Sequence, residues 1–322
     1  SRGVPDWSAD TLASGHLRFA GGVYAGAMSA SSAVNHKPGH RALGHSDLQV
    51  EGHRVAVVTG ASSGIGRASA IALAKAGFEV WAGARRTEKM VELGDHGIRI
   101  LGLDVTDDAS MQHFVDAVLA GAGRIDVLVN NAGFGLYGSV EDVPVQTGRE
   151  LFDVNLFGLA RMVQLVLPTM RAQKSGRIVN ISSIGAKIYE PFGSWYHASK
   201  FAVEGFSDSL RLEVRPFGID VSLVEPGVIV SEWNSIARKD FVEVSKGGAY
   251  EKAAKRFARL LALADKRSMG SSPEVVAEVV VAASMATRPR TRYAIGVGAG
   301  TAVAARRFLP DKAMDAVLGR LG

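Results

Sequence analysis

Residues 54–66 read RVAVVTGASSGIG, a short β-branched run that leads directly into a glycine-rich turn. The apolar run to Val58 predicts a buried strand, and the segment RASAIALAKAG after the turn predicts a helix. Between them, Gly60 would allow a tight turn, Gly64 a close approach of backbone to a pyrophosphate, and Gly66 close packing of the helix on the strand. Phosphate oxygens held there would meet the N–H groups at the helix start. The stretch therefore predicts a dinucleotide-binding α/β fold.

The rest of the chain continues this alternation of strands and helices. Further apolar runs of strand length occupy residues 79–83, 98–103, 125–129, 176–181, 219–224 and 292–296. Longer amphipathic segments predict helices, among them 144–173, a stretch that ends near Arg215 before Pro216, and 274–286. Strands that alternate with helices in this way form a parallel sheet, because each helix carries the chain back across the sheet.

The composition of the 322 residues is ordinary for a globular protein, with 47% hydrophobic and 21% charged residues. The chain has no cysteine, which removes thiol chemistry and makes a disulfide-stapled secreted scaffold untenable. The net charge of +5 is spread along the chain, whereas nucleic-acid binding favours a concentrated basic patch. No apolar run approaches the roughly eighteen residues of a membrane span. We expect a cytoplasmic protein with no nucleic-acid partner, no membrane span and no metal site.

Residues 1–50 differ from the rest of the chain. They are rich in Gly, Ala, Ser and His and show no sustained helical or strand period. We interpret them as a flexible extension, a segment left from expression or an over-long translated start, so their place in the mature protein stays open. His36, His40 and His45 could bind a metal, but in a flexible tail they are expected to be bystanders.

A second informative stretch, residues 182–200, reads SSIGAKIYEPFGSWYHASK. On a helix, Tyr196 and Lys200 share one face, about 5–6 Å apart at Cβ. The ammonium is expected to lower the pKa of the phenol, which suits proton exchange with an alcohol or carbonyl oxygen near neutral pH. Ser183 could supply a second hydrogen bond to the same oxygen. An amphipathic helix with an interfacial tyrosine and a solvated lysine would show the same spacing.

These motifs together carry a family resemblance. The glycines are spaced T-G-x-x-x-G-x-G, the sequence NNAG follows a strand at 130–133, and Ser183, Tyr196 and Lys200 come later at workable intervals. Beyond its first fifty residues the chain resembles the classical branch of the short-chain dehydrogenase/reductase family. The resemblance implies one Rossmann-type α/β domain over residues 51–322, a doubly wound parallel sheet of about seven strands in the order 3-2-1-4-5-6-7.

The resemblance also implies a nicotinamide cofactor. Family members that prefer NAD usually carry Asp where this chain has Ala84, and Arg85 follows, ready to pair with a 2′-phosphate. We therefore expect NADP(H) rather than NAD(H), although two surface arginines that cap a helix would look alike. The residues expected at the cofactor are Thr59, Gly60, Ser62, Ser63, Gly64, Ile65, Gly66, Arg85, Arg86, Asp104, Val105, Asn131, Ala132, Gly133, Tyr196, Lys200, Pro226, Gly227, Val228 and Ser231.

Some of these positions have a structural alternative. Asp104, expected at the adenine, could instead cap the helix that begins near Asp107. Asn131 in NNAG could serve backbone geometry as well as a ligand, because Asn and Gly tolerate positive φ. Ser231 stands where the family motif has Thr and keeps the hydroxyl that holds the nicotinamide amide.

The resemblance further implies hydride transfer between NADP(H) and a carbonyl or secondary alcohol, as in a carbonyl reductase. Tyr196 would be the general acid in reduction and the base in oxidation. Lys200 would lower its pKa and hold the nicotinamide ribose, while Ser183 polarises the substrate oxygen. Asn155 matches a family asparagine that kinks the long helix and holds a water linked to the lysine, although an asparagine among apolar neighbours is usually a satisfied core amide.

Residues 232–270 depart from the regular alternation and are expected to form the substrate lid. Their aromatic share, and a likeness to hydroxysteroid and retinol dehydrogenases, favour a hydrophobic ketone or alcohol, although a helix packed on the core would look the same. A homodimer or homotetramer through the helices at 145–173 and 195–215 is implied by resemblance. Two other functions stay open: a sensor that binds NADP(H) without catalysis, and an epimerase or dehydratase on the same fold.

Overall fold

The computed structural model describes residues 53–230, 241–264 and 270–319. The expected N-terminal extension with its histidines, Ser231 and parts of the expected lid lie outside the described residues. Residues 51–322 form one compact unit.

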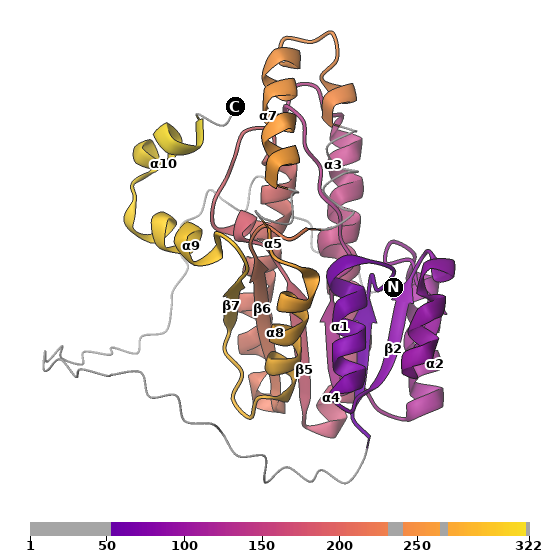
Figure 1. Ribbon diagram of the computed structural model, residues 1–322. Coiled ribbons are helices and arrows are strands. Elements are labelled where there is room, and N and C mark those ends of the chain that lie inside the picture. The colour runs from indigo at the N-terminus through magenta and orange to yellow at the C-terminus, as the bar shows by residue number, and fades with distance from the viewer. Residues whose placement is uncertain (1–52, 231–240, 265–269, 320–322) are drawn as a thin grey trace, which may run out of the picture. The chain divides into compact units, whose positions relative to one another are not determined.

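Seven parallel strands form a single sheet in the order β3-β2-β1-β4-β5-β6-β7, which confirms the expected topology (Figure 1). Every expected strand is present, with small shifts at the ends. The strands are β1 Val55–Thr59, β2 Glu79–Ala84, β3 Arg99–Gly102, β4 Val127–Asn130, β5 Gly176–Ile181, β6 Ile219–Pro226 and β7 Arg292–Ile295. Strand order reverses between β1 and β4, and ligands of such sheets bind at the carboxyl ends of the strands beside this switch point.

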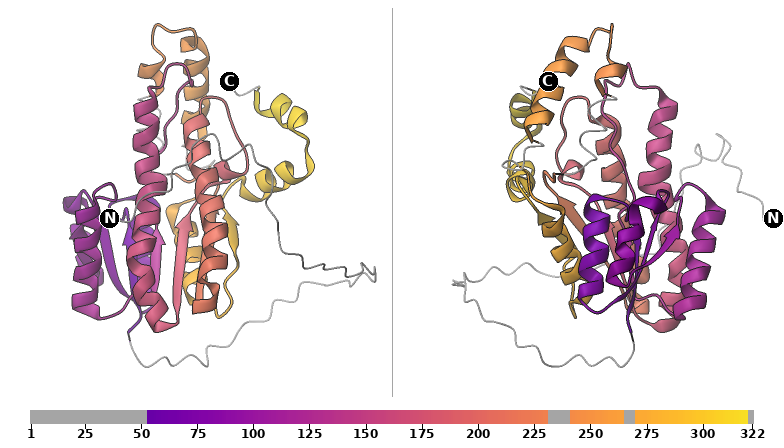
Figure 2. Two further views of the ribbon diagram at one scale, coloured as in Figure 1. Left: turned by 180° about the vertical axis from the view of Figure 1, so that it is seen from behind. Right: turned by 45° about the vertical axis from the view of Figure 1, so that its right-hand side comes forward.

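Helices cover both faces of the sheet (Figures 1 and 2). One face carries α1 Gly64–Lys75, the short helix η2 Thr87–His96 and α8 Pro273–Met285. The other carries α2 Asp108–Ala122, α4 Leu159–Gln173 and α5 Ser194–Val214. The helix expected at 274–286 is thus α8, and the helix expected to end near Arg215 is α5.

The apolar residues of β1 contribute to the core on both faces of the sheet. Val55 and Val57 pack towards α2, α4 and α5, whereas Ala56 and Val58 pack towards α1, η2 and α8. Successive side chains of a strand point to opposite faces, so a strand covered on both faces is apolar throughout. This packing fixes the carboxyl ends of β1, β4, β5 and β6 at one edge, where the loops with the expected site residues begin.

The long helix expected at 144–173 is present but is interrupted by a π-helical turn. It consists of α3 Val145–Phe152, the π turn η3 Asp153–Gly158 and α4. Among the described residues it is the one helix long and apolar enough to cross a membrane by length and composition, with a mean hydropathy of 1.3. Its Met162, Val166 and Met170 are buried against the sheet, as in the core helix of a globular domain.

The remaining elements lie at the ends of the sheet, η5 at the amino end of β6 and the others around the carboxyl edge. They are η4 Ile184–Ala186, η5 Arg215–Phe217, α7 Glu251–Ala264, α9 Ala299–Phe308 and α10 Asp311–Leu318. Helix α7, part of the expected lid, rises above this edge in Figure 1. Helix α10 is tied to the loop before α5, because the Tyr189 hydroxyl donates to Asp315 Oδ1 at 2.7 Å.

Candidate active site

The glycine-rich turn after β1 is closed against the loop that follows β4. Gly60 has φ of +67°, and a Cβ there would lie 2.8 Å from Ala132 Cα. A Cβ on Gly66 would overlap the Gly60 carbonyl oxygen and Asn131 Nδ2. Asn131 Nδ2 donates to the carbonyl oxygens of Thr59 at 3.0 Å and Gly60 at 3.1 Å. The turn therefore requires glycine at both positions, as expected, and Gly66 packs on the turn itself.

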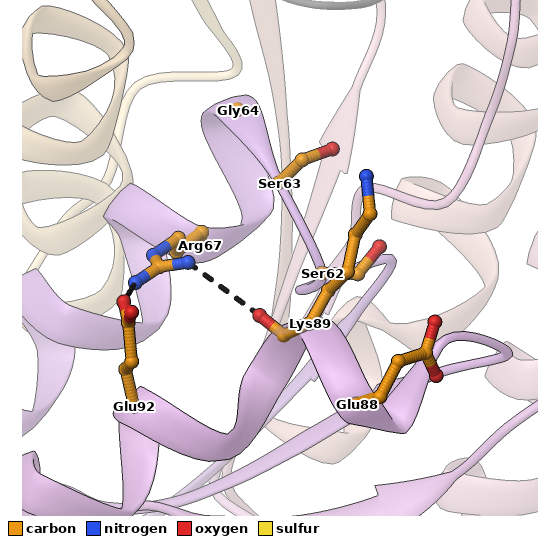
Figure 3. Close-up of a pocket in the computed structure, with 7 residues that line it drawn as sticks. All are labelled: Ser62, Ser63, Gly64, Arg67, Glu88, Lys89 and Glu92. Atoms are coloured by element: carbon orange, nitrogen blue, oxygen red, sulfur yellow. Dashed lines mark hydrogen bonds and ion pairs between the residues drawn. The ribbon is translucent and has the colours of Figure 1, made fainter.

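The start of α1 is arranged to receive an anion. Ser63 precedes the helix without a side-chain capping hydrogen bond, and no acidic residue stands in the first turn. Uncapped N–H groups at a helix start carry partial positive charge and bind phosphate. Ser62 accepts from Arg86 Nη2 at 3.3 Å, and Ile65 packs on the core. A cavity of about 410 Å³ opens here (Figure 3); it is lined by Ser62, Ser63, Gly64, Arg67, Glu88, Lys89 and Glu92.

A basic side chain follows the end of β2. Arg85 is exposed directly after the buried Ala84. Partial burial acts to raise the pKa of Asp104, but hydrogen bonds from Thr106 and the charge of Arg85 outweigh it and hold that pKa below its usual value. Arg85 thus lies within electrostatic reach of the loop after β3.

Asp104 shapes this loop and does not cap the following helix. Its Oδ1 accepts from the backbone N of Thr106 at 3.0 Å and from the Thr106 hydroxyl at 2.7 Å. Helix α2 is capped instead by Asp107, whose Oδ1 accepts from Ala109 N at 2.9 Å. The capping alternative for Asp104 is therefore wrong. The carbonyl of the next residue, Val105, lies so close to Gly158 of η3 that a Cβ on Gly158 would overlap it.

The NNAG motif is bound to β1 through a threonine hydroxyl. Thr59 Oγ1 accepts from the backbone N of Asn131 and of Ala132, both at 3.0 Å. Asn130 Nδ2 donates to Asn180 Oδ1 at 3.0 Å and so links β4 to β5. These contacts give the motif a structural role, because they place the loop backbone beside the glycine-rich turn. None of its four residues has a positive φ, so that reason for the motif is wrong.

Ser183, Tyr196 and Lys200 come together at the carboxyl end of β5. Ser183 Oγ accepts from Gly185 N at 3.0 Å, and the Ser183 side chain is also hydrogen-bonded to the Tyr196 phenol. Lys200 Nζ donates to the Ile181 carbonyl at 2.9 Å. The neighbouring Ser182 has a buried hydroxyl with no hydrogen-bond partner among the described residues. The structure thus links Ser183 to Tyr196 and binds Lys200 to the last residue of β5, while Ser182 takes part in none of these side-chain hydrogen bonds.

Burial dominates the proton affinities of this group. It raises the pKa of Tyr196 to about 12, the charge of Glu190 adds to the effect, and the hydrogen bond from Ser183 opposes it. Burial likewise lowers the pKa of Lys200 to about 8, against the charge of Glu204. The expectation of a lowered Tyr196 pKa is therefore wrong for the protein by itself, because desolvation of the phenolate outweighs any favourable nearby charge.

Asn155 lies in the π turn η3 and is only 1% exposed. Its Oδ1 accepts from Phe134 N at 3.0 Å, while its Nδ2 donates to the Phe134 carbonyl at 3.0 Å and to Ser199 Oγ at 3.1 Å. A Cβ on Gly133 would approach the same Oδ1 to 3.0 Å. The helix is thus distorted at Asn155, as expected, and the amide binds the NNAG loop to α5.

The segment after β6 is attached to β7. Gly227 N donates to the Ile295 carbonyl at 2.8 Å, and Val228 N donates to the Val297 carbonyl at 3.2 Å. A Cβ on Gly227 would overlap that Val297 oxygen. Pro226 ends β6 and is buried. Backbone pairing therefore holds three expected nicotinamide-side residues at the same edge as Tyr196.

The described part of the expected lid forms an aromatic cluster beside Tyr196. The ring of Tyr137 lies 6.4 Å from that of Tyr196 and 6.1 Å from that of Phe257 on α7. Phe192 lies 5.0 Å from Phe241 between ring centroids. A cavity of about 650 Å³ adjoins this cluster; it is lined by Ser139, Val140, Glu141, Pro191, Phe192, Tyr250 and Gly319.

Comparison with known proteins agrees with this geometry. The family model described as short chain dehydrogenase matches residues 54–240. The chain belongs to this family. A probable short-chain type dehydrogenase/reductase of Helicobacter pylori is 35% identical to this dehydrogenase over 83% of the chain and 98% of its own length. A 3-ketodihydrosphingosine reductase of Bacteroides thetaiotaomicron is 34% identical, with coverage of 82% and 96%. Human retinol dehydrogenase 8 is 35% identical, with coverage of 74% and 80%.

Solved structures extend the comparison to cofactor complexes. A short-chain dehydrogenase of Streptomyces avermitilis has a TM-score of 0.68 and 35% identity, over 84% of this chain and 95% of that one. A metagenomic short-chain oxidoreductase in complex with NADP has a TM-score of 0.59 and 30% identity, with coverage of 76% and 97%. A Burkholderia phymatum member in complex with NAD has a TM-score of 0.69 and 25% identity, with coverage of 83% and 95%. This dehydrogenase is an NAD(P)-dependent oxidoreductase.

Five residues at or near the two cavities were missed by sequence analysis. Arg67 forms an ion pair with Glu92, and Lys89 lines the cavity beside it (Figure 3). Lys89 could have been found from the sequence, because it is a second basic residue four positions after Arg85. The hydroxyl of Tyr137 donates to Glu190 Oε1 at 2.9 Å, and no spacing in the sequence indicates that pair.

Proposed function

We propose that this dehydrogenase transfers hydride between NADP(H) and the carbonyl or secondary alcohol carbon of an apolar substrate. The observation that carries the proposal is the junction of Ser183, Tyr196 and Lys200 at the carboxyl end of β5. Ligands of parallel sheets bind at this edge, so a substrate oxygen there can accept hydrogen bonds from the Ser183 hydroxyl and the Tyr196 phenol.

In the proposed reduction, Ser183 and Tyr196 both donate to the substrate oxygen. Tyr196, with a pKa of about 12, keeps its proton near neutral pH and gives it to that oxygen as the carbonyl carbon becomes tetrahedral. Lys200, with a pKa of about 8, is still an ammonium at neutral pH and stabilises the phenolate left behind. Asn155 supports this site by joining η3 to α5 through Ser199.

The cofactor residues fit a phosphorylated dinucleotide. When bound, the nicotinamide cofactor supplies or accepts the hydride. The uncapped start of α1 suits the pyrophosphate, and Asn131, Asp104 and Val105 border the adenosine side. The preference for NADP(H) rests on Arg85, Arg86 and Lys89 beside Ser62, since guanidinium and ammonium groups pair with a 2′-phosphate. Relatives in complex with NADP and with NAD are both known, so this preference is our proposal.

An apolar substrate is supported by the walls around Tyr196. Tyr137, Phe241 and Phe257 form one buried cluster, and Phe192 packs on it. Two relatives are named for 3-ketodihydrosphingosine and for retinol. Burial of hydrocarbon against such walls contributes about 25 cal/mol per Å².

The assembly we propose is a homodimer or homotetramer formed through the long helix at 145–173, which comprises α3, η3 and α4, and through α5. The exposed apolar residues Phe157 in η3, and Phe201 and Leu212 in α5, favour a partner surface there. A second copy of the chain would cover these side chains and remove them from water. A cytoplasmic location stays a prediction.

Consumption of NADPH with a panel of aldehydes, apolar ketones and diketones tests the reaction. Tyr196→Phe should lower kcat by about 10²–10⁴ with little change in NADPH affinity, because only the proton donor is removed. Tyr293→Phe, which removes a hydroxyl from β7, is the matched control. Turnover that survives in Tyr196→Phe would overturn the assigned role, and NADPH binding without turnover of any carbonyl would favour a sensor.

A further inference from the structure

Glu190 places a carboxylate beside the reactive phenol. It lies in the loop between Ser183 and Tyr196, and its Oε1 accepts the Tyr137 hydroxyl at 2.9 Å. The Tyr137 ring in turn lies 6.4 Å from that of Tyr196. The reaction proposed above does not use this carboxylate, yet a substrate held against Tyr196 must come near it.

The loop holds Glu190 in a fixed position. Glu190 N donates to His197 Nε2 at 3.2 Å, and His197 Nδ1 contacts the Gly185 carbonyl at 2.7 Å. Phe192 adopts φ of +69°, a strained value for a bulky residue, and its carbonyl accepts from Gly138 N at 2.8 Å. Strained backbone persists where surrounding contacts determine it, and it is concentrated at functional sites. A rigid loop of this kind pre-organises a binding group.

Among the described residues, no lysine or arginine forms an ion pair with Glu190. His197 Nε2, 4.0 Å from Glu190 Oε1, is engaged by the backbone N of Glu190, and its Nδ1 lies against the Gly185 carbonyl, so the ring donates no hydrogen bond to the carboxylate. Lys187 forms ion pairs with Glu204 and Glu225 instead. A carboxylate among aromatic rings with no partner cation is suited to a cationic ligand, which both the carboxylate and the ring faces attract.

The space next to Glu190 also suits the rest of such a ligand. Its side chain is 24% exposed and so is not closed off from solvent. Pro191 and Phe192, which follow it directly, line the cavity of about 650 Å³ together with Val140 and Tyr250. Ser139 and Glu141 add polar groups to the lining, while its apolar side chains accommodate a hydrocarbon chain.

We propose that Glu190 binds the protonated amine of the substrate, and that this dehydrogenase acts on amino alcohols and amino ketones whose nitrogen lies next to the reacting carbon. The inference rests on the proposed reaction, because Tyr196 marks where the reacting carbon is held. The ammonium donates to Glu190, the alcohol oxygen meets Tyr196 and Ser183, and the apolar chain extends into the cavity. Tyr137 positions the carboxylate through its hydroxyl.

The test compares three alcohols of one chain length: 2-amino-3-decanol, 3-decanol and 2,3-decanediol. NADP⁺ reduction gives kcat/KM, and calorimetric titration into the NADP⁺ complex gives Kd. Glu190→Gln keeps the shape of the side chain and removes the charge; Glu278→Gln, on the exposed side of α8, is the matched control. A hydrogen bond to a charged group contributes about 1.5–3 kcal/mol, so we expect roughly a 10-fold or larger preference for the amino alcohol.

Glu190→Gln should remove this preference, measured within the variant as the ratio of kcat/KM for 2-amino-3-decanol to kcat/KM for 3-decanol. The ratio is the readout because the charge of Glu190 also raises the pKa of Tyr196, and a change there affects both alcohols alike. Equal binding of 2-amino-3-decanol and 3-decanol by the wild type would overturn the inference. So would a preference for the diol over the amino alcohol, which would assign the carboxylate to a hydroxyl. If the amino alcohol binds more tightly through Glu190 but no alcohol is oxidised, the inference stands and the proposed reaction fails.

Discussion

Replacing Lys200 with methionine should stabilise the cofactor-free protein below about pH 8 while it removes oxidoreductase activity. Lys200 is 8% exposed, and burial lowers its pKa from 10.5 to about 8 in spite of the charge of Glu204. At about 1.4 kcal/mol for each pKa unit, this lowering means that burying the Lys200 ammonium costs the folded state about 3 kcal/mol. Methionine fills a similar space without a charge, so the variant avoids this desolvation penalty.

The direction of the pH dependence follows from which state of the chain, folded or unfolded, binds more protons. The unfolded chain holds the Lys200 proton below about pH 10.5, whereas the folded chain holds it only below about pH 8. Between these values the unfolded state binds more protons, so the free energy of unfolding of the wild type rises with pH. The variant also loses the hydrogen bond to the Ile181 carbonyl, about 1 kcal/mol. Its net advantage is therefore about 2 kcal/mol at neutral pH and disappears as pH rises towards 10.5.

Urea unfolding at a series of pH values from neutral to 10 measures this difference. Both proteins are compared without cofactor and at one protein concentration, because ligand and assembly shift apparent stability. Lys75→Met, at the exposed end of α1, reports the effect of removing a surface lysine. A difference in the free energy of unfolding that is the same at every pH, or a variant less stable than wild type at neutral pH, would refute the claim that burial disfavours the ammonium.

Two further predictions concern the cofactor side. Arg85→Ala should raise the Kd for NADPH about tenfold and that for NADH hardly at all, because the guanidinium pairs with the 2′-phosphate; Arg288→Ala is the control, and equal losses for both cofactors would contradict the NADP(H) proposal. Gly66→Ala should destabilise the fold by about 1–3 kcal/mol and weaken cofactor binding, because its Cβ would overlap the Gly60 carbonyl. Gly94→Ala is the matched control, because a Cβ there meets nothing within 4 Å. If Gly66→Ala had the same free energy of unfolding as the wild type, the turn would be able to move, and this prediction would be wrong.

The sequence predicts those features of the fold that depend on short stretches. Strand β5 occupies residues 176–181 as predicted, because a run of β-branched residues bounded by glycine is a local signal. Tyr196 and Lys200 lie on α5 for the same reason, since the i,i+4 spacing is a property of one helix. The strand order needed the family resemblance, because periodicity alone does not say which strands pair.

Contacts between distant segments could not be predicted. Tyr137 and Glu190 are 53 residues apart, and nothing in either segment indicates the other. The π turn at Asp153–Gly158 is a second case, because the crowding of Gly158 on the Val105 carbonyl comes from another part of the chain. Such contacts depend on the packed layers, which a linear pattern does not record.

The Tyr196 pKa was predicted in the wrong direction for the same reason, because it too depends on packing. A four-residue spacing reports that an ammonium is near, but the pKa depends on how much water the packed protein removes from both groups. Burial disfavours phenolate and ammonium alike, so it raises one pKa and lowers the other. The charge of Glu204 opposes the lowering of the Lys200 pKa. Glu204 itself forms ion pairs with Lys187 at 2.5 Å and with Arg292 of β7 at 2.9 Å. Proton affinity at the site therefore depends on side chains from α5, β7 and the loop after η4, and only the folded chain brings these together.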